Sequence, residues 1–288
     1  MTMPAAAAAF TPDPVVAEAA ERAFADLARR YHERRKGEEM AAREELLAMV
    51  EQLGFADALP APDGREAWAQ AAPILRAQAR AAAPLDMAWI LATGERSGAI
   101  AYDPESYDTT AGPLPAREDA RVALALGRLQ QIAAAMQAAL ELTLRFVRDR
   151  RQFGRPLAQF QAIQHSLAVA AEEVAATHAA ADGALACAAT EGIAAARLAF
   201  LLDGAALVAS RGVEVVYDAC HQAHGAIGFT REYALARHSL DLLRWRDNLL
   251  ALRGGELACA ERLGERVLEA GGLWRAVTGA MTAGGDHD

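Results

Sequence analysis

The sequence predicts an all-α protein, with an N-terminal helical region and a C-terminal four-helix bundle joined by a short connector. Three observations support this prediction. Apolar residues make up 53% of the chain and aromatic residues only 6%, so the apolar mass is mostly Ala, Leu and Val, and Ala and Leu favour helices. Long segments repeat apolar residues at helical spacing, and short corners containing Gly or Pro separate these segments.

The N-terminal region, residues 1–96, is expected to be helical. Pro14 suits the first turn of its first helix, and Gly37 lies in a break within the helical pattern. A loop rich in Gly and Pro follows before the pattern resumes. The expected helices cover residues 14–51 with a break at 36–39, then 66–80 and 85–93, with the loop at 53–64.

Residues 97–117 are expected to form a short connector. This stretch contains two tyrosines and few helix formers, with Gly and Pro near its end. Residues 99–102 are compatible with a short strand. The change in composition separates the N-terminal region from the bundle.

Residues 118–270 are predicted to form the bundle. In the first long helix Leu129, Ile132, Met136 and Leu140 recur at helical spacing. Four long apolar-faced helices joined by short loops are typical of a helical bundle. The expected helices cover residues 118–148, 162–190, 192–220, 231–246 and 249–270, with a Gly-rich loop at 221–230 and a flexible tail at 271–288.

The charge and the cysteines narrow the functional classes. A net charge of −9 argues against a nucleic-acid-binding protein, which normally has a basic face. Cys187, Cys220 and Cys259 are far apart in apolar helical contexts, so we expect buried thiols in a reducing compartment. The N-terminus does not resemble a signal peptide, and no stretch reaches the ~20 apolar residues of a membrane span, so a cytoplasmic location is expected.

A basic corner links the first two long helices of the bundle. Its Gly and Pro account for the turn, but they do not account for Arg150, Gln152 and Phe153. Arginine offers a planar fork of donors to a phosphate, an amide both donates and accepts, and Phe offers a stacking face. These residue types are typical of a nucleotide site. The alternative is an exposed helix end, where arginine interacts favourably with the negative end of the helix dipole.

A second motif is the Gly-containing loop that follows the third long helix. Gln222, Gly225 and Ala226 would let a ligand approach the main-chain amides closely, and backbone N–H groups bind phosphate or ribose oxygens. The alternative is an ordinary helix-breaking loop. His221 and His224 flank it, but a metal site needs a third ligand and none is evident, so no metal is expected.

The two motifs, in this order and at this separation, resemble the C-terminal helical domain of the flavin-dependent acyl-CoA dehydrogenases. The resemblance is close over residues 118–262. It implies that the motifs contact the adenosine diphosphate half of an FAD shared with a neighbouring subunit. The family usually has a second glycine where this chain has Ala226, whose methyl group could crowd the cofactor. The expected contact residues are Arg150, Gln152, Phe153, Gln161, Gln222, Gly225 and Ala226.

Two features of the family are missing from the sequence. The family has a β-domain where this chain has only the connector. The family's catalytic base is a Glu, since proton abstraction beside a thioester needs a carboxylate in a dry pocket where its pKa can rise. This chain has Leu124 and Leu249 at the two places where the family puts that Glu. Asp247, two residues from the second place, is the nearest candidate for a base.

These observations predict the smaller subunit of a heteromeric acyl-CoA dehydrogenase, similar to the α2β2 enzymes of steroid side-chain or ring catabolism. A larger partner subunit would supply the β-domain, the flavin-ring contacts and the catalytic Glu. The assembly would oxidise an acyl-CoA substrate and pass electrons to an electron-transfer acceptor. Two alternatives remain: a self-sufficient homomeric dehydrogenase that uses Asp247, and a structural or regulatory bundle without flavin.

Overall fold

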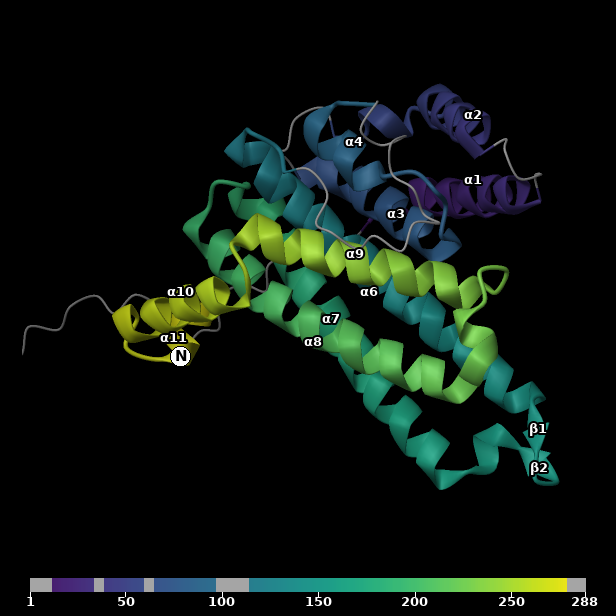
Figure 1. Ribbon diagram of the computed structural model, residues 1–288. Helices are drawn as coiled ribbons and strands as arrows, with labels where there is room; N and C mark the ends of the chain where they lie inside the picture. The colour runs from purple at the N-terminus through teal and green to yellow at the C-terminus, as the bar shows by residue number, and fades with distance from the viewer. Residues whose placement is uncertain (1–11, 34–38, 60–64, 97–113, 279–288) are drawn as a thin grey trace, which may run out of the picture.

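The computed structural model describes residues 12–33, 39–59, 65–96 and 114–278, and these residues are almost entirely helical (Figure 1). The predicted all-α class is therefore confirmed. The sheet formed within these ranges is a pair of two-residue strands, β1 (Arg151–Gln152) and β2 (Arg155–Pro156). Most of the predicted connector, including the possible strand at 99–102, lies outside the described residues.

The N-terminal region contributes four helices within the described ranges, close to their predicted positions. Asp13 caps the first, because its Oδ1 accepts hydrogen bonds from the backbone N–H groups of Val15 (2.9 Å) and Val16 (3.3 Å). Gly94, with φ 74°, ends the fourth. The helices are α1 (Pro14–His32), α2 (Glu39–Gln52), α3 (Arg65–Ala81) and α4 (Met87–Thr93), with a 3-10 turn η1 (Phe55–Asp57) after α2.

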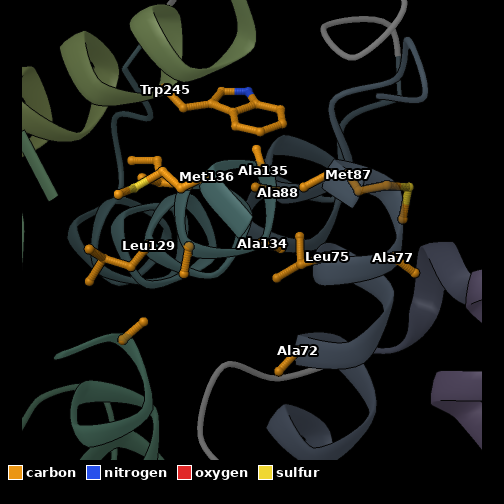
Figure 2. Close-up of a cluster of buried hydrophobic side chains, with 14 of the residues drawn as sticks. Ala72, Leu75, Ala77, Met87, Ala88, Leu129, Ala134, Ala135, Met136 and Trp245 are labelled. Carbon is orange, nitrogen blue, oxygen red and sulfur yellow. The ribbon is translucent and has the colours of Figure 1, made fainter. Parts of the chain in front are cut away.

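Four long helices form the bundle, as predicted. They are α6 (Glu118–Asp149), α7 (Gln161–Glu191), α8 (Ala196–His224) and α9 (Ala234–Arg253). The central helix is α6, which packs against the other three and also against α3 and α4 (Figure 1). Figure 2 shows Ala135 and Met136 of α6 beneath Trp245 of α9, with Met87 and Ala88 of α4 beside them. One core therefore joins the N-terminal helices to the bundle.

Small residues let these helices approach closely. A Cβ atom added to Gly212 of α8 would lie 2.9 Å from Cε of Met136 in α6 and 2.9 Å from Oγ1 of Thr177 in α7. A Cβ atom added to Gly127 of α6 would lie 3.1 Å from the Cβ of Ala88 in α4. Because these distances are shorter than an ordinary van der Waals contact, a larger residue at either position would push the helices apart.

The three cysteines are buried and free of disulfides, as predicted. Burial raises the pKa of the Cys220 thiol to about 11, so it behaves as a neutral packing group. None of the helices in the described ranges is both long and apolar enough to cross a bilayer.

The predicted loop at 221–230 is wrong at its start, because α8 continues through His224. The four residues 221–224 have side chains that a helix tolerates, so nothing local stops the helix there. Gly225, with φ 64° and ψ −145°, is the first residue whose backbone leaves the helical region. The chain then forms a 3-10 helix, η3 (Gly225–Phe229), where the sequence predicts an irregular loop.

The predicted break between 246 and 249 is also wrong, because α9 runs on to Arg253. Leu249 and Leu252 extend its buried face, and Gly254 and Gly255, both with positive φ, end it. The next helix is consequently α10 (Glu256–Glu269), and a short α11 (Leu273–Thr278) lies within the segment predicted as a tail.

A buried polar network ties the N-terminal region to the bundle. Two guanidinium nitrogens of Arg128 in α6 donate to the two carboxylate oxygens of Asp86, each over 2.6 Å. Its Nε donates to Oδ1 of Asn248 in α9 (2.8 Å), and its Nη1 donates to Oε1 of Gln131 (2.8 Å). Gln131 in turn donates to Gln78 of α3 (2.7 Å). All five side chains belong to residues that are more than nine-tenths buried, so each charge is compensated inside the core.

Replacing Arg128 with Met should lower the free energy of unfolding by about 3–5 kcal/mol, because the Asp86 carboxylate would stay buried without its partner. Urea unfolding followed by circular dichroism measures this loss. The control is Arg22→Met, which removes an exposed ion pair with Glu18 and should have little effect. Similar losses for the two variants would contradict the importance of the buried pair.

Two histidines, the half-buried His32 on α1 and the buried His238 on α9, are neutral because burial disfavours their charged forms. Burial lowers the pKa of His238 to about 4, and the positive charges of Arg237 and Arg80 add to this effect. Burial also lowers the pKa of His32 to about 4, again with a contribution from Arg237. The folded chain therefore resists protonation at sites that the unfolded chain protonates near pH 6.5.

Acidification should consequently destabilise the fold. Stability is complete above the unfolded pKa of 6.5 and is lost as the pH falls toward the folded pKa of about 4, because the unfolded state binds more protons in that window. His238→Gln should flatten this dependence relative to the wild-type chain. Urea unfolding between these pH values measures both slopes, and an unchanged slope for His238→Gln would count against the assignment.

Candidate functional site

A cleft of about 430 Å³ lies where the corner after α6 meets the end of α8. The residues that line it come from two segments of the chain, 146–157 and 222–227, which contain the two sequence motifs. Five residues predicted to bind a cofactor line this cleft: Arg150, Gln152, Gln222, Gly225 and Ala226. The other lining residues are Phe146, Leu157, Ala223, His224 and Ile227. The structure thus brings the two predicted motifs together at one site.

The corner forms its wall as a tight β-hairpin. In the β1–β2 pair, Gln152 lies opposite Arg155, and the Leu157 N–H donates to the Arg150 carbonyl over 2.9 Å. Side chains alternate between the two sides of an extended segment. Arg150 and Gln152 are two residues apart and therefore point to the same side, which is the side of the cleft.

The hairpin turn consists of Phe153 and Gly154. Both have positive φ, 51° and 80°, as in a type I′ turn. The left-handed conformation costs a residue with a side chain roughly 1–2 kcal/mol, yet Phe153 adopts it with a relative exposure of 89%. Its ring contacts Phe160 edge-on, with centroids 6.1 Å apart. Strain at an exposed aromatic residue points to a binding role, although Phe153 does not line this chain's own cleft.

The opposite wall begins where η3 leaves α8. Gly225 has φ 64° and ψ −145°, a combination that is in effect restricted to glycine. This conformation turns the chain so that Gly225 and Ala226 border the cleft. Ala226 does not have a positive φ, so its methyl group is compatible with the local backbone conformation.

Aromatic rings form the base of the cleft. The ring of Phe146 stacks on that of His224, with centroids 4.2 Å apart. Nδ1–H of His224 donates to the Cys220 carbonyl (2.8 Å), and burial lowers the pKa of His224, so the ring is neutral. Its Nε2 therefore accepts from the hydroxyl of Tyr233 (3.1 Å). These bonds fix the end of α8 against the start of α9.

His221 supports the η3 turn from below. The Ser239 hydroxyl donates to the Leu235 carbonyl (2.8 Å), so His221 Nε2–H donates to Ser239 Oγ (2.7 Å). Its Nδ1 is then a buried acceptor without a partner, and burial lowers the pKa of His221 to about 4. A Cβ atom added to Gly228 would lie 3.1 Å from this Nδ1. His221 therefore packs under the turn, and no cluster of three metal-ligating side chains occurs in the described ranges.

The electrostatics of the cleft come from one unpaired cation. Arg150 is the only charged residue in the lining, and it forms no salt bridge within the described part of the chain. Gln152 and Gln222 add neutral donors and acceptors beside it. A guanidinium, two carboxamides and an aromatic base suit an anionic ligand that carries a flat polar ring, such as a nucleotide.

The remaining predicted site residues lie elsewhere. Gln161 begins α7 at an exposed position outside the cleft lining. Asp247, the candidate base, lies on α9 and accepts a hydrogen bond from Nε of Arg246 (2.8 Å). It is not part of the cleft either. Leu124 and Leu249, the two positions at which the sequence analysis looked for a base, are buried in the core with 0% and 1% exposure.

Five lining residues were not predicted as binding residues: Phe146, Leu157, Ala223, His224 and Ile227. Phe146 precedes Arg150 by four residues, so the helical period could have placed it on the same side. Leu157 lies opposite Arg150 in the hairpin, which only the register reveals. His224 was considered as a metal ligand, and its role beneath the cleft depends on contacts with Phe146 and Tyr233 that no local pattern predicts.

One family model matches part of the bundle. The model of the family described as "Acyl-CoA dehydrogenase, C-terminal domain" matches residues 118–246. This range contains both sequence motifs and the whole lining of the cleft. Among curated proteins, none matches the sequence significantly.

Solved structures share the fold over most of the chain. A chain from a variant of the Tcur3481-Tcur3483 steroid ACAD is 18% identical with a TM-score of 0.64, covering 89% of this chain and 98% of that chain. A chain of the ChsE4-ChsE5 complex from Mycobacterium tuberculosis is 13% identical with a TM-score of 0.66, covering 93% and 98%. A glutaryl-coenzyme A dehydrogenase in its glutaryl-CoA complex is 14% identical with a TM-score of 0.63, covering 97% and 100%. At these identities the likeness shows a common fold.

Replacing Gly225 with Ala should lower the free energy of unfolding by about 1–3 kcal/mol, because alanine is strained in this conformation. No atom lies within 4 Å of the added Cβ, so the loss would report backbone strain and not a clash. Gly264→Ala is the matched control, since its added Cβ also meets nothing within 4 Å and it lies inside α10. It should stabilise the chain by about 0.5–1 kcal/mol. Urea unfolding of both variants checks the opposite signs, and a shared sign would refute the strain at Gly225.

Proposed function

We propose that this chain, whose residues 118–246 match the model of the acyl-CoA dehydrogenase C-terminal domain, is one subunit of a flavin-dependent acyl-CoA dehydrogenase built from two unlike chains. Its cleft would bind the adenosine diphosphate half of an FAD shared across the subunit interface. A larger partner subunit would carry the β-domain, the flavin-ring contacts and the catalytic Glu. The assembly would oxidise the α,β-bond of an acyl-CoA thioester and pass the electrons to an electron-transfer acceptor.

The observation that carries this proposal is the convergence of the two motifs in one cleft. Arg150, Gln152, Gln222, Gly225 and Ala226 come from segments that meet only in the folded chain. The unpaired Arg150 guanidinium matches a diphosphate in charge and geometry. The Gly225 backbone leaves room for close approach, since a Cβ atom there would meet nothing within 4 Å. The donor set therefore fits the nucleotide half of FAD.

FAD, when bound, would supply the group that accepts hydride from the acyl chain. The residues of this chain would bind and orient its nucleotide end. Arg150 would neutralise the diphosphate, while Gln152 and Gln222 would direct hydrogen bonds to the polar groups around it. Phe153, exposed at the hairpin turn, and Gln161, at the exposed start of α7, would complete these contacts in the assembled enzyme.

The residues at the candidate positions for a catalytic base support an active site that is divided between two chains. Leu124 and Leu249 are buried leucines, and neither can accept a proton. Asp247 forms an ion pair with Arg246 (2.8 Å) and lies outside the cleft lining. The partner subunit would therefore supply the base, and this chain would supply part of the cofactor site.

Two of the similar folds favour a heteromeric assembly. Their names each pair two gene products, Tcur3481 with Tcur3483 and ChsE4 with ChsE5, and the first is named a steroid ACAD. Nearly the whole of each matched chain aligns with this one, 98% in both cases. On this analogy we propose a steroid-derived CoA ester as the substrate class, although fold alone does not determine a substrate.

Purified alone, the chain should contain no flavin, whereas co-expression with a full-length acyl-CoA dehydrogenase chain from the same organism should give a yellow complex. Absorbance of released flavin, expressed per heterodimer, measures the difference. A yellow isolated chain that oxidises acyl-CoA would support the homomeric alternative and overturn this proposal.

Arg150→Ala in the complex should weaken FAD binding by about 10- to 100-fold, because a hydrogen bond to a charged group contributes ~1.5–3 kcal/mol. Arg275→Ala, on α11 and exposed, is the control and should leave the flavin content unchanged. Equal flavin retention in the Arg150 variant and the control would favour a structural bundle without a cofactor role.

A further inference from the structure

The arginines of the described chain fall into two groups. Many are paired with carboxylates, even on exposed helices; examples are Arg80 with Glu141, Arg197 with Glu191, Arg211 with Glu173 and Arg253 with Asp203. The arginines at the end of α6 and in the hairpin are different. Within the described residues, four of them form no salt bridge: Arg148, Arg150, Arg151 and Arg155. They give this end of an acidic protein a concentrated positive charge.

The backbone assigns two of these arginines to the cleft side. Arg150 lines the cleft. Arg155 lies opposite Gln152 in the hairpin, and directly opposed residues project to the same side of a strand pair. Its guanidinium is stacked over the Phe160 ring, 4.1 Å from the centroid, a favourable cation–π geometry.

The other two arginines point away from the cleft. Arg151 lies between Arg150 and Gln152, which both line the cleft, so alternation along the extended segment sends its side chain to the opposite side. Arg148 follows Phe146 by two residues in α6, and a helix turns about 100° per residue, so Arg148 lies about 200° around the axis from that cleft-lining ring. Arg148 and Arg151 are both exposed. We refer to them as the outer arginines.

The outer arginines form no salt bridge with any residue that the structure describes. Like charges this close repel each other, and water and salt screen the repulsion only in part. The negative end of the α6 dipole offsets a fraction of it. Arg145 and Arg275 are also exposed and form no salt bridge in the described chain, but Arg148 and Arg151 belong to a cluster of unpaired arginines, and this concentration of positive charge indicates an anionic group supplied from outside.

We propose that the outer arginines dock an acidic surface of the partner subunit while the cleft side of the same hairpin binds the cofactor. This inference rests on the proposed function. It assigns to one hairpin, β1–β2, contacts with both the nucleotide and the partner subunit that shares the nucleotide. A protein surface fits better than a nucleic acid, since the chain as a whole has a net charge of −9. The expected partner surface carries Asp or Glu side chains beside its flavin site.

The test uses the flavin-containing complex of the full-length chain and its partner. Arg151→Glu and Arg148→Glu should each weaken assembly by about tenfold at low ionic strength, and the effect should shrink near 1 M salt, where the Debye length is about 3 Å. Sedimentation velocity over a NaCl series measures the dissociation constant. Arg275→Glu is the matched control, because it makes the same charge change at an exposed residue of α11 that has no salt bridge in the described chain.

The flavin content of each assembled complex separates the two sides of the hairpin. The outer variants should retain wild-type flavin per heterodimer, whereas Arg150→Ala should lose flavin. If the outer variants lose flavin and still assemble normally, these arginines belong to the cofactor site and the inference is overturned. It is also overturned if Arg275→Glu weakens assembly equally, since the effect would then be one of net charge.

The failure of this inference can be distinguished from failure of the proposed function. A wild-type chain that forms no flavin-containing complex with any acyl-CoA dehydrogenase partner overturns both. A wild-type chain that forms the complex, with outer variants that assemble as tightly as it does, overturns the docking surface alone. Thermal unfolding of each variant by circular dichroism checks that these exposed substitutions leave the fold intact.

Discussion

The cleft depends on how α6 ends. The N–H of Arg150 donates back to the Phe146 carbonyl over 2.8 Å, and the Arg150 carbonyl accepts from the N–H of Leu157 over 2.9 Å. One residue therefore closes the helix and opens the hairpin, with no flexible linker between them. Phe146, Arg150 and Gln152 consequently face the same space, and their positions follow from backbone hydrogen bonds and not from side-chain preference.

The rest of the molecule keeps α6 in place. Its middle is fixed by Arg128, which reaches α4 and α9 through Asp86 and Asn248. A further ion pair, Arg80 with Glu141 (2.9 Å), links α3 to its second half. The N-terminal helices thus act as a brace along the helix that carries the cleft at its end (Figure 1).

The sequence alone predicted the helices and site residues that depend on local residue patterns. Apolar periodicity located the long helices, and the residue types of the two motifs predicted five of the residues that line the cleft. Helix ends were harder to predict from the sequence. The end of α8 depends on the conformation of Gly225, and the length of α9 depends on the burial of Leu252. The bonds of His224 join residues from two helices. The cofactor roles of all seven predicted contact residues remain predictions, and two of them, Phe153 and Gln161, lie outside the cleft of the single chain.

The buried network also limits how this chain can change during evolution. Loss of Arg128 alone, or of Asp86 alone, leaves an ionised group stranded in an apolar interior, so a single substitution passes through a poorly folded intermediate. An exchange of both for apolar residues of similar volume can be neutral. Relatives that keep this architecture should therefore conserve or replace the acid and the base together, and the pair should appear in an alignment as two coupled columns.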